Sequence, residues 1–325
     1  MLIRKVSVFL HATFHTQVRC ATYEKRDKMN IFYSIIYDSK LNRIIRNLNY
    51  FLSPLLPKKI KIHPAGLLNV KINDHNSIKL KTNQTSYVTR ELFWKGCQNY
   101  EYTPIFIKLI QKVDDFFDIG SSIGYFSVLG AKVNENLNVQ AFEPSTGSMI
   151  YLSENVKING FSERINVNFL ALSDKSGQID FSEIRNKKYP TIYNLSGEHN
   201  IGTKPHLKSI TTKIDSDTLD NFVSNKHIAN IDLMKLDTEG CEDLILRNAS
   251  ITIEKFKPII ICEILFDRIE SELEKIMFEH KYEFYNHVGN GLKKVNSIKR
   301  KSDNGIRNCF FVHPTKKYLI EEFIK

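Results

Sequence analysis

Residues 116–126 of this 325-residue chain have the sequence Phe116-Phe117-Asp118-Ile119-Gly120-Ser121-Ser122-Ile123-Gly124-Tyr125-Phe126. The apolar residues before Asp118 predict a buried strand that ends at this acid, and the apolar residues after Ser122 predict a helix. The two glycines between them allow a sharp turn and a close approach of a ligand to the backbone. The amides of this loop and of the helix N-terminus are expected to offer donors to a polar or anionic ligand. Asp118 would lie at the rim of a sheet, where open α/β folds bind their ligands.

The spacing of the two glycines bears on the kind of ligand. The loop has the form G-x-x-x-G, so the dinucleotide fingerprint G-x-G-x-x-G is absent. A carboxylate just before the first glycine suits an ammonium group better than a pyrophosphate. This favours an amino-acid-like ligand, such as the methionine end of S-adenosylmethionine. For the loop taken alone, an ordinary strand–turn–helix link without a ligand is the alternative.

Composition indicates a soluble globular protein of one large or two smaller domains, with 42% hydrophobic and 25% charged residues. The five cysteines are scattered and form no C-x-x-C pair, which argues against a disulfide framework and a structural zinc. A reducing, cytoplasmic setting is therefore expected. Residues 1–10 make a poor signal peptide, and no apolar run approaches the length of about 18 residues that a membrane span needs.

The chain is basic, with a net charge of +10 and lysine clusters near residues 58–61 and 293–301. Such patches suit an acidic substrate, an anionic membrane surface or nucleic acid. Nucleic acid is disfavoured because no aromatic residues alternate with the basic ones. Apolar residues at helical spacing between 32 and 48 predict a basic amphipathic helix. This helix would either contact a membrane peripherally or pack on its own domain or a partner.

The rest of the chain predicts three segments. Residues 1–60 would form a helical extension, 61–112 a lead-in of strands and helices with a lid, and 113–325 an α/β domain. The lead-in would contain short strands over 67–80 and the lid helix over 104–111. In the α/β domain, further strands are expected over 139–144, 165–172, 231–237, 258–265, 282–287 and 309–313, and helices over 123–132, 148–159, 242–248 and 271–280. This alternation predicts a parallel sheet with helical crossovers.

Acids fall within or at the ends of four predicted strands: Asp118, Glu143, Asp237 and Glu263. The carboxyl ends of parallel strands gather along one edge, and four acids there are costly unless they hold a cation, bind hydroxyls or take part in chemistry. Glu143 stands where a carboxylate accepts hydrogen bonds from a ribose diol, with a solvated strand end as the alternative. The segment Ala171-Leu172-Ser173-Asp174 could border an adenine, with an ordinary strand end as an equal alternative.

The stretch Lys235-Leu236-Asp237-Thr238-Glu239-Gly240-Cys241-Glu242 is a second candidate motif. Asp237 or Glu239 could accept a proton from a hydroxyl as general base. For Glu242 we favour a role in capping the following helix. Asp237, Glu239 and Glu263 could also bind a divalent cation, but the sequence does not require one and no metal is expected.

In these pieces the chain resembles the FkbM-type S-adenosylmethionine-dependent methyltransferases. The matching pieces are 118–125, Phe142-Glu143-Pro144, Ala171-Leu172-Ser173-Asp174, 236–242 and 258–263, within about Glu91 to Pro314. The resemblance implies a class I methyltransferase (Rossmann-like) fold, a seven-stranded, mostly parallel sheet with an antiparallel last strand. It also implies S-adenosylmethionine as cofactor and O-methylation of a hydroxyl on a sugar, glycan or related small molecule.

Carried over to this chain, the family's cofactor site comprises Asp118, Gly120, Ser121, Ser122, Gly124, Tyr125, Glu143, Pro144, Ala171, Leu172, Ser173 and Asp237. Of these, Asp118, Gly120 and Gly124 would hold the methionine moiety, and Asp237 would face the methyl-transfer site. The catalytic base would be Asp237, Glu239 or Glu263. Ser121-Ser122 replace the Ala-Asn usual in the family, and Glu101 resembles an acid that the family often carries upstream of the loop.

Two other classes of protein remain alternatives. A nicotinamide-dependent oxidoreductase has a similar sheet, but the missing third glycine and the acid before the loop speak against it. A non-catalytic nucleoside-binding scaffold would have no physical need for a full set of acids along the rim.

Overall fold

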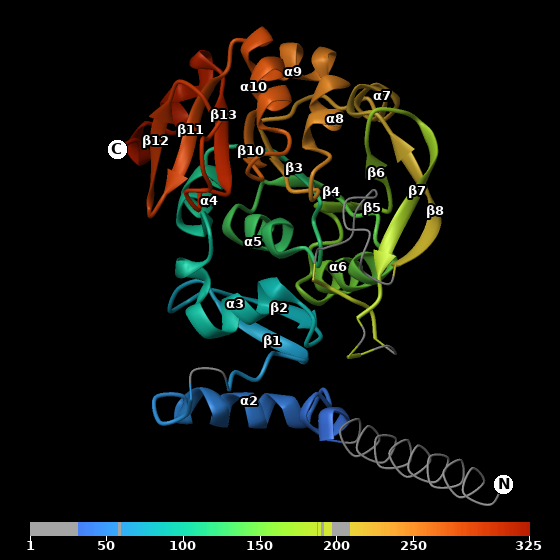
Figure 1. The fold of residues 1–325 in the computed structure, drawn as a ribbon, viewed down its shortest axis with the longest axis vertical. Coiled ribbons are helices and arrows are strands. Elements are labelled where there is room, and N and C mark those ends of the chain that lie inside the picture. The colour runs from blue at the N-terminus through green and yellow to red at the C-terminus, as the bar shows by residue number, and fades with distance from the viewer. Residues whose placement is uncertain (1–31, 58–59, 187, 190–191, 197–208) are drawn as a thin grey trace, which may run out of the picture. The chain divides into compact units, whose positions relative to one another are not determined.

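The computed structural model describes residues 32–57, 60–186, 188–189, 192–196 and 209–325. The described chain divides into an N-terminal unit that ends at Leu67 and a C-terminal unit, Leu68–Lys325. The predictions made for residues 1–31 lie outside the described residues. Figure 1 shows the elements with their labels.

The N-terminal unit contains the helical residues 32–36 and the helix α2, Leu41–Leu52. The predicted helix over 32–48 is thus interrupted, because residues 37–40 between the two helical segments form a turn. The buried side of α2 is polar, because it is formed by Asn42, Arg46 and Asn49. These side chains bond to the backbone of residues 60–67, as when Arg46 donates to the carbonyls of Ala65 at 2.9 Å and Leu67 at 2.7 Å.

The C-terminal unit is built on a twisted eight-stranded sheet (Figure 1). In order across the sheet, its strands are β12 Gly291–Val295, β11 Glu283–Val288, β13 Asn308–Val312, β10 Ile259–Glu263, β9 Leu233–Leu236, β3 Asp115–Ile119, β4 Asn138–Phe142 and β5 Ile165–Asn168. The last strand, β13, runs antiparallel between β10 and β11, and the strands from β10 to β5 are parallel. This is the class I methyltransferase arrangement that was predicted. The eighth strand, β12, pairs with β11 at the edge and was not anticipated.

Helices cover both faces of this sheet, as the crossovers between parallel strands require (Figure 1). One buried cluster joins the sheet to α4 Thr103–Ile110, α5 Tyr125–Val133 and α6 Thr146–Ile158. The other cluster joins it to α7 Leu219–Asn225, α8 Glu242–Arg247, α9 Ser250–Phe256 and α10 Glu270–Glu279. The helix predicted over 104–111 as a lid is α4, and it packs as part of the core with Ile105, Phe106, Leu109 and Ile110 buried.

The remaining elements lie outside the main sheet. The predicted short strands are β1 Gly66–Lys71 and β2 Ser77–Thr82, and they are followed by α3 Tyr87–Lys95 and the short helix η1 Cys97–Asn99. A separate sheet has the order β6 Ala171–Leu172, β8 Ser209–Asp217 and β7 Gly177–Ile184. The chain ends with η2 Pro314–Leu319 and η3 Glu321–Phe323.

Two features correct or complete the sequence analysis. The single strand predicted over 165–172 is two strands, because β5 pairs with β4 in the main sheet whereas β6 pairs with β8. Among the described residues, the cysteines Cys97, Cys241, Cys262 and Cys309 are buried free thiols. No helix within the described ranges is long and apolar enough to cross a membrane.

Candidate active site

Four adjacent strands bring the predicted acids to one edge of the sheet. The order β4–β3–β9–β10 places Glu143, Asp118, Asp237 and Glu263 at or just beyond the carboxyl ends of neighbouring parallel strands. This edge is where open α/β sheets bind ligands. The sequence prediction that these acids share one rim is therefore met in the fold.

Gly120 allows the loop after β3 to lie against the loop after β9. Its φ is +75°, and a Cβ at this position would lie 1.9 Å from the carbonyl oxygen of Asp237. Gly124 also has a positive φ, of +84°, and a Cβ there would meet the side chain of Leu152 at 2.5 Å. At Gly120 the backbone carbonyl excludes any side chain, and at Gly124 the positive φ favours glycine.

Three amides of this loop, expected to be offered to a ligand, donate within the protein instead. Gly120 and Ser121 both donate to the carbonyl of Phe142, at 3.1 and 2.9 Å. The amide of Ser122, which has a positive φ of 51°, donates to the Glu143 carboxylate at 2.8 Å. The loop is thus held in shape by β4 rather than by a bound anion.

Asp118 has a structural role at the N-terminus of α5. Its Oδ2 accepts hydrogen bonds from the Ser127 amide at 3.1 Å and from the Ser127 hydroxyl at 2.6 Å. This satisfies an amide of the first helical turn, as an N-cap side chain does. The other oxygen, Oδ1, is buried, accepts no hydrogen bond within the described residues, and lies 3.5 Å from the Lys235 ammonium.

Lys235 is the site residue that sequence analysis missed. It is the Cα partner of Asp118 between β3 and β9, and its buried ammonium donates to the Gly120 carbonyl at 3.0 Å. It also lies 3.3 Å from Asp237 Oδ2. Burial lowers the pKa of Lys235, but Asp237, Asp118 and Glu101 together outweigh this effect and raise it above its usual value. A lysine within the apolar strand Leu233–Leu236 was the available signal, because a buried charge needs partners.

Glu143 is buried just after β4. Its carboxylate accepts hydrogen bonds from the amides of Ser122 and Ser145, both at 2.8 Å. Burial raises the pKa of Glu143 to about 7, although these two amides and Lys235 act in the opposite direction. A carboxylate held in this way at the strand end can accept further hydrogen bonds from a diol.

The loop after β9 is held by Glu242, the first residue of α8. Glu242 accepts from the Thr238 amide at 2.6 Å, from the Thr238 hydroxyl at 2.9 Å and from the Gly240 amide at 3.1 Å. These bonds hold the loop before the helix; α8 has no side-chain cap bond, although Glu242 lies in its first turn, where the prediction of a favourable dipole interaction placed it. Between them, Glu239 is half-buried and has a positive φ of 61°. The side chain of Asp237 is 40% exposed, so a ligand can reach it.

Glu263, at the end of β10, has a buried carboxyl oxygen, Oε2, without a hydrogen-bond partner among the described residues. Burial first, and then the charges of Asp237, Glu239, Glu242 and Glu101, raise its pKa well above the usual range. This shift favours the protonated form of Glu263, which can donate a hydrogen bond.

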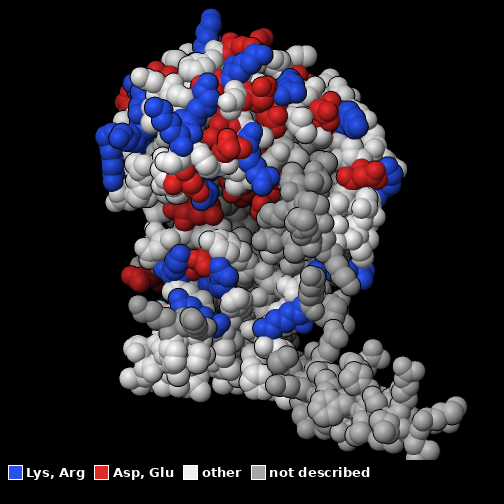
Figure 2. All heavy atoms as spheres, in the orientation of Figure 1, with Lys and Arg blue, Asp and Glu red and all other residues white. Residues whose placement is uncertain are grey.

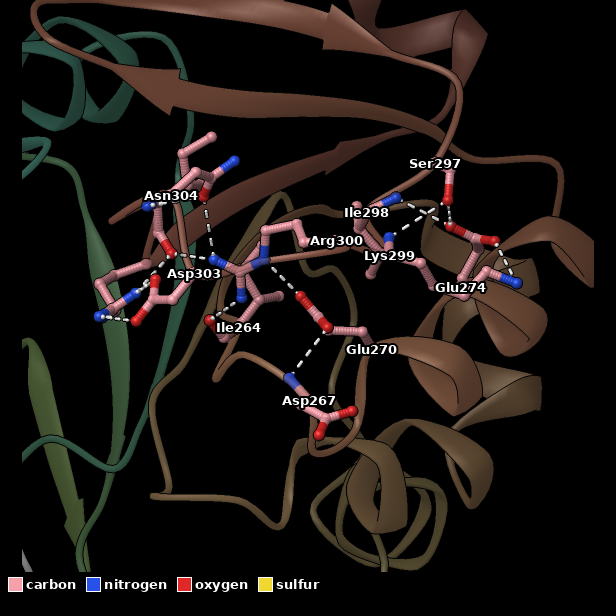
Figure 3. A network of polar contacts seen from close by, with 12 residues as sticks. Ile264, Asp267, Glu270, Glu274, Ser297, Ile298, Lys299, Arg300, Asp303 and Asn304 are labelled. Carbon is pink, nitrogen blue, oxygen red and sulfur yellow. Dashed lines mark hydrogen bonds and ion pairs between the residues drawn. The ribbon is translucent and has the colours of Figure 1, made fainter.

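A buried ion pair fixes the backbone that follows Glu263 (Figure 3). Arg300 is paired with Glu270 at 2.5 Å, and both side chains are 6% exposed. The same guanidinium donates to the carbonyl of Ile264 at 3.0 Å. Arg300 thereby connects the segment after β12 to the end of β10 and to the start of α10.

Glu101 joins the acids of the rim from the turn before α4. Its side chain is exposed, yet protein atoms surround it closely enough that burial raises the pKa of Glu101 to about 7. The negative charge of Asp237 acts in the same direction and Lys235 in the opposite one, so the three groups interact. The weak resemblance noted at this residue was its only sequence signal.

An apolar pocket is lined in part by the Gly120 loop. Its lining includes Gly120, Pro144, Ala171 and Leu172, as expected for the adenine border, together with Ile119, Phe142, Leu170, Phe181, Thr238 and Cys241. Ser173 is buried and does not line this pocket, because its hydroxyl donates to Asp174 at 3.1 Å.

Two further predicted residues make hydrogen bonds within the protein. The Tyr125 hydroxyl bonds to that of Thr103 at 3.1 Å, and its ring packs edge-to-face on Tyr100 in the core. The Ser121 hydroxyl donates to the Asp118 carbonyl at 2.6 Å. In both, the side chain supports the local structure.

No group of three or more His, Cys, Asp or Glu side chains in the described part of the chain could hold a metal ion. Of the acids of the rim, Asp118 and Asp237 lie within 3.5 Å of the Lys235 ammonium.

These features fit an adenosine-containing, cationic cofactor. The Gly120 loop packs directly against the carbonyl of Asp237, and Gly120 also lines an apolar pocket together with Pro144 and Ala171. Carboxyl groups with raised pKa values, such as Glu143, would gain from a nearby positive charge. The sheet order, with the antiparallel strand β13 between β10 and β11, defines a class I methyltransferase fold.

The comparisons with known proteins extend this result to the family. The model of the methyltransferase FkbM domain matches residues 118–284, which is just over half of the chain. The chain therefore belongs to the FkbM methyltransferase family, and its cofactor is S-adenosylmethionine. No curated protein matches the sequence significantly.

Several solved structures are similar in fold. The methyltransferase FkbM from Methylobacillus flagellatus KT matches with 15% identity and a TM-score of 0.40, covering 62% of this chain and 43% of that one. TrmK from M. capricolum, in complex with S-adenosylhomocysteine, matches with 15% identity and a TM-score of 0.36 over 68% of each chain. The precorrin-6y C5,15-methyltransferase from Geobacter metallireducens GS-15 matches with 8% identity and a TM-score of 0.37, over 65% of this chain and 86% of that one. These remote likenesses carry no conclusion about substrate.

Proposed function

We propose that this protein is an O-methyltransferase that methylates a hydroxyl group of a sugar, glycan or related small molecule. The observation that supports it best is the rim of Asp118, Glu143, Asp237 and Glu263 around the Gly120 loop. When bound there, S-adenosylmethionine supplies a methyl group activated by the positive charge of its sulfur. The hydroxyl acceptor rests on the family resemblance.

Each part of the cofactor has a counterpart among the residues of the rim. Glu143 would accept hydrogen bonds from the ribose hydroxyls, and Pro144, Ala171 and Leu172 would enclose the adenine. The exposed carboxylate of Asp237 and the carbonyl of Gly120 would bind the ammonium of the methionine part. Asp118 would act indirectly, because it fixes the start of α5 and Lys235.

For the proton of the acceptor hydroxyl we propose Glu101 as the general base. A base works best when its pKa lies near the working pH, and the pKa of Glu101 is raised to about 7. Among the acids predicted as bases, Glu263 has a raised pKa that favours its protonated form, so it would instead donate a hydrogen bond to the acceptor. The Asp237 carboxylate is paired with Lys235, which leaves Glu239 as the competing base.

The two alternative classes predict different binding. A nicotinamide-dependent oxidoreductase would bind NADH at this rim, whereas the Asp237 and Glu101 carboxylates would repel its pyrophosphate. A non-catalytic scaffold would bind the nucleoside but would turn over no acceptor.

The test measures binding and transfer in the full chain. Calorimetry with S-adenosylmethionine and S-adenosylhomocysteine is expected to show binding that Glu143→Gln weakens by about ten-fold or more, since a hydrogen bond to a charged group contributes roughly 1.5–3 kcal/mol. Transfer of a labelled methyl group to a panel of sugars and phenols then identifies the acceptor. Absence of binding to the wild type would overturn the proposal, and binding without any transfer would favour the scaffold.

The role of Glu101 has its own control. Glu101→Gln is expected to lower kcat about 100-fold or more while the cofactor affinity stays within two-fold, as for loss of a general base. Glu163→Gln, a surface substitution of the same kind, should change neither. If Glu101→Gln retains full turnover and Glu239→Gln loses it, the base is Glu239.

A further inference from the structure

The polar side of helix α2 faces the segment 60–67 of the same unit. Asn42 donates to the carbonyl of His63 at 3.1 Å, and Asn49 accepts from the amide of Ile62 at 2.8 Å. Arg46, also buried, holds the carbonyls of Ala65 and Leu67. The segment 60–67 thus covers the polar face of α2 and fixes it within the N-terminal unit.

The opposite face of α2 is apolar and exposed. We call Leu41, Ile44, Leu48, Phe51 and Leu55 the apolar stripe. Their spacing of three and four residues places them along one side of the helix and the turn after it. They are 46%, 68%, 56%, 79% and 84% exposed, respectively. Figure 2 shows the region of α2 on its visible face as almost entirely uncharged side chains.

Exposed apolar side chains in such a row indicate a binding surface. A helix in a globular protein normally turns this stripe toward the core, and contiguous exposed apolar patches mark contact with a protein or a membrane. In the helical turn before α2, Phe32 and Ile35 are also more than half exposed, at 60% and 51%. The surface therefore extends beyond α2 itself.

The distribution of charge along the chain bears on whether the apolar stripe contacts a protein or a membrane. Residues 1–67 contain twelve lysines and arginines and three acids, a net charge of +9 out of +10 for the whole chain. Residues 68–325 contain 34 basic and 33 acidic residues and are nearly neutral. The basic excess of this protein thus lies almost entirely in the unit that exposes the apolar stripe.

A second copy of the chain would fit this surface poorly. Two units of net charge +9 repel each other, and a stable coiled coil needs an apolar repeat of about three to four heptads. The stripe from Leu41 to Leu55 covers only about two. An anionic lipid surface attracts the basic unit and accepts apolar side chains between its headgroups.

We propose that the N-terminal unit binds the surface of an anionic phospholipid membrane, with the apolar stripe of α2 inserted at the headgroup level. The helix lies in the plane of the interface, because its 12 residues span about 18 Å and the hydrocarbon core is about 30 Å thick. Asn42, Arg46 and Asn49 hold α2 in this orientation, so that its apolar face is available before the membrane is met. Lys40 and Arg43, also exposed on α2 or at its start, would contact lipid phosphates.

The test is sedimentation of the full chain with vesicles of phosphatidylcholine alone or with 30% phosphatidylglycerol. Binding to the anionic vesicles is expected to exceed that to the neutral ones by about ten-fold or more, and to fall several-fold between 0.1 and 0.5 M salt as the charges are screened. Two double variants, Ile44→Gln with Leu48→Gln and Phe51→Gln with Leu55→Gln, should each reduce binding by about ten-fold. Glutamine keeps a good helix propensity at these exposed positions.

The matched control is Ile251→Gln on α9, where the isoleucine is 71% exposed in the C-terminal unit. It should bind vesicles like the wild type, and circular dichroism should show all four proteins folded. Equal binding to neutral and anionic vesicles would overturn the proposal, as would wild-type binding by either stripe variant. A wild type that is dimeric in sedimentation velocity, with monomeric stripe variants and no binding to vesicles, would assign the stripe to a second copy instead.

Discussion

The ammonium of Lys235 lies 3.5 Å from Asp118 Oδ1, and both side chains are at most 5% exposed. The two residues are Cα partners on β9 and β3, so the strand register itself makes this pair. Around it, Asp237 and the Gly120 carbonyl complete the contacts of the ammonium. The centre of the candidate site is thus an internal charge network, and the ligand-facing groups are arranged around it.

Lys235→Met is expected to lower the free energy of unfolding by about 3–5 kcal/mol, because it leaves Asp118 as a buried carboxylate without a counter-charge. Urea denaturation measures this change. Adding Asp118→Asn should restore part of the loss, since the amide oxygen can still accept from Ser127. The control, Lys213→Met, breaks an ion pair with Asp180 that is 61% and 65% exposed, and should cost less than about 1 kcal/mol. Equal effects of the two lysine substitutions would contradict the buried pair.

A comparison of Gly120 with Gly160 separates the cost of backbone strain from the cost of a close contact with a neighbouring loop. Gly120 and Gly160 both have a φ of +75°, but only Gly120 has a neighbour, the carbonyl of Asp237, where a Cβ would stand. Gly160→Ala should cost roughly 1–2 kcal/mol through the backbone alone. Gly120→Ala should cost more and should also weaken S-adenosylhomocysteine binding by about ten-fold or more, because the two loops must move apart. Thermal unfolding and calorimetry on both variants test this, and equal effects would show that the approach is not tight.

Part of the site could be predicted because its signals are local. Asp118, Glu143 and Asp237 each follow an apolar run, and runs of this kind end at the sheet edge in an α/β fold. The positions of Gly120 and Gly124 likewise follow from the turn that the sequence requires. The order of the strands came from the family resemblance, because no local pattern states which strand lies beside which.

The parts that could not be predicted depend on long-range pairing. The run from Ile165 to Leu172 is continuously compatible with one strand, but Ala171 pairs with Ser216, 45 residues further along the chain. The partners of Lys235 depend in the same way on the register between β9 and β3. The Phe142 carbonyl accepts hydrogen bonds from two of the loop amides. A sequence does not show such a contact, so these amides were predicted to face a ligand.

The raised pKa of Glu143 predicts a pH dependence of stability. Its pKa in the folded protein is about 7, above the ordinary 4.5, so folding favours the protonated form. The stabilisation is complete below about pH 4.5 and is lost as the pH rises through 7, by roughly 3 kcal/mol for this residue alone. Glu143→Gln should therefore be less sensitive to pH between 5 and 8 in urea denaturation. A wild-type protein whose stability rises with pH in step with the variant would refute this.

The affinity for the cofactor should rise with pH, whereas the contribution of Glu143 to stability falls. A ribose diol donates hydrogen bonds most favourably to an ionised Glu143, so the affinity for S-adenosylhomocysteine is expected to increase as the pH rises through about 7. Calorimetry from pH 6 to 8.5 measures this, and Glu143→Gln should flatten the curve. An affinity that falls with pH in the wild type would exclude the carboxylate as the acceptor of the diol.

Glu242 offers the sharpest test of how the loop after β9 is held. Its carboxylate accepts three hydrogen bonds from Thr238 and Gly240 in a buried setting. Glu242→Ala leaves those donors without an acceptor, which should cost about 2–3 kcal/mol and expose the amides of residues 238–240 to faster hydrogen exchange. Asp243→Asn on the same helix removes only an ion pair with Arg247 at 3.5 Å and should leave that exchange unchanged. Since Asp237 begins this loop, the first variant should also weaken cofactor binding. Unchanged exchange in Glu242→Ala would mean that the contact with Gly120, rather than Glu242, holds the loop in place.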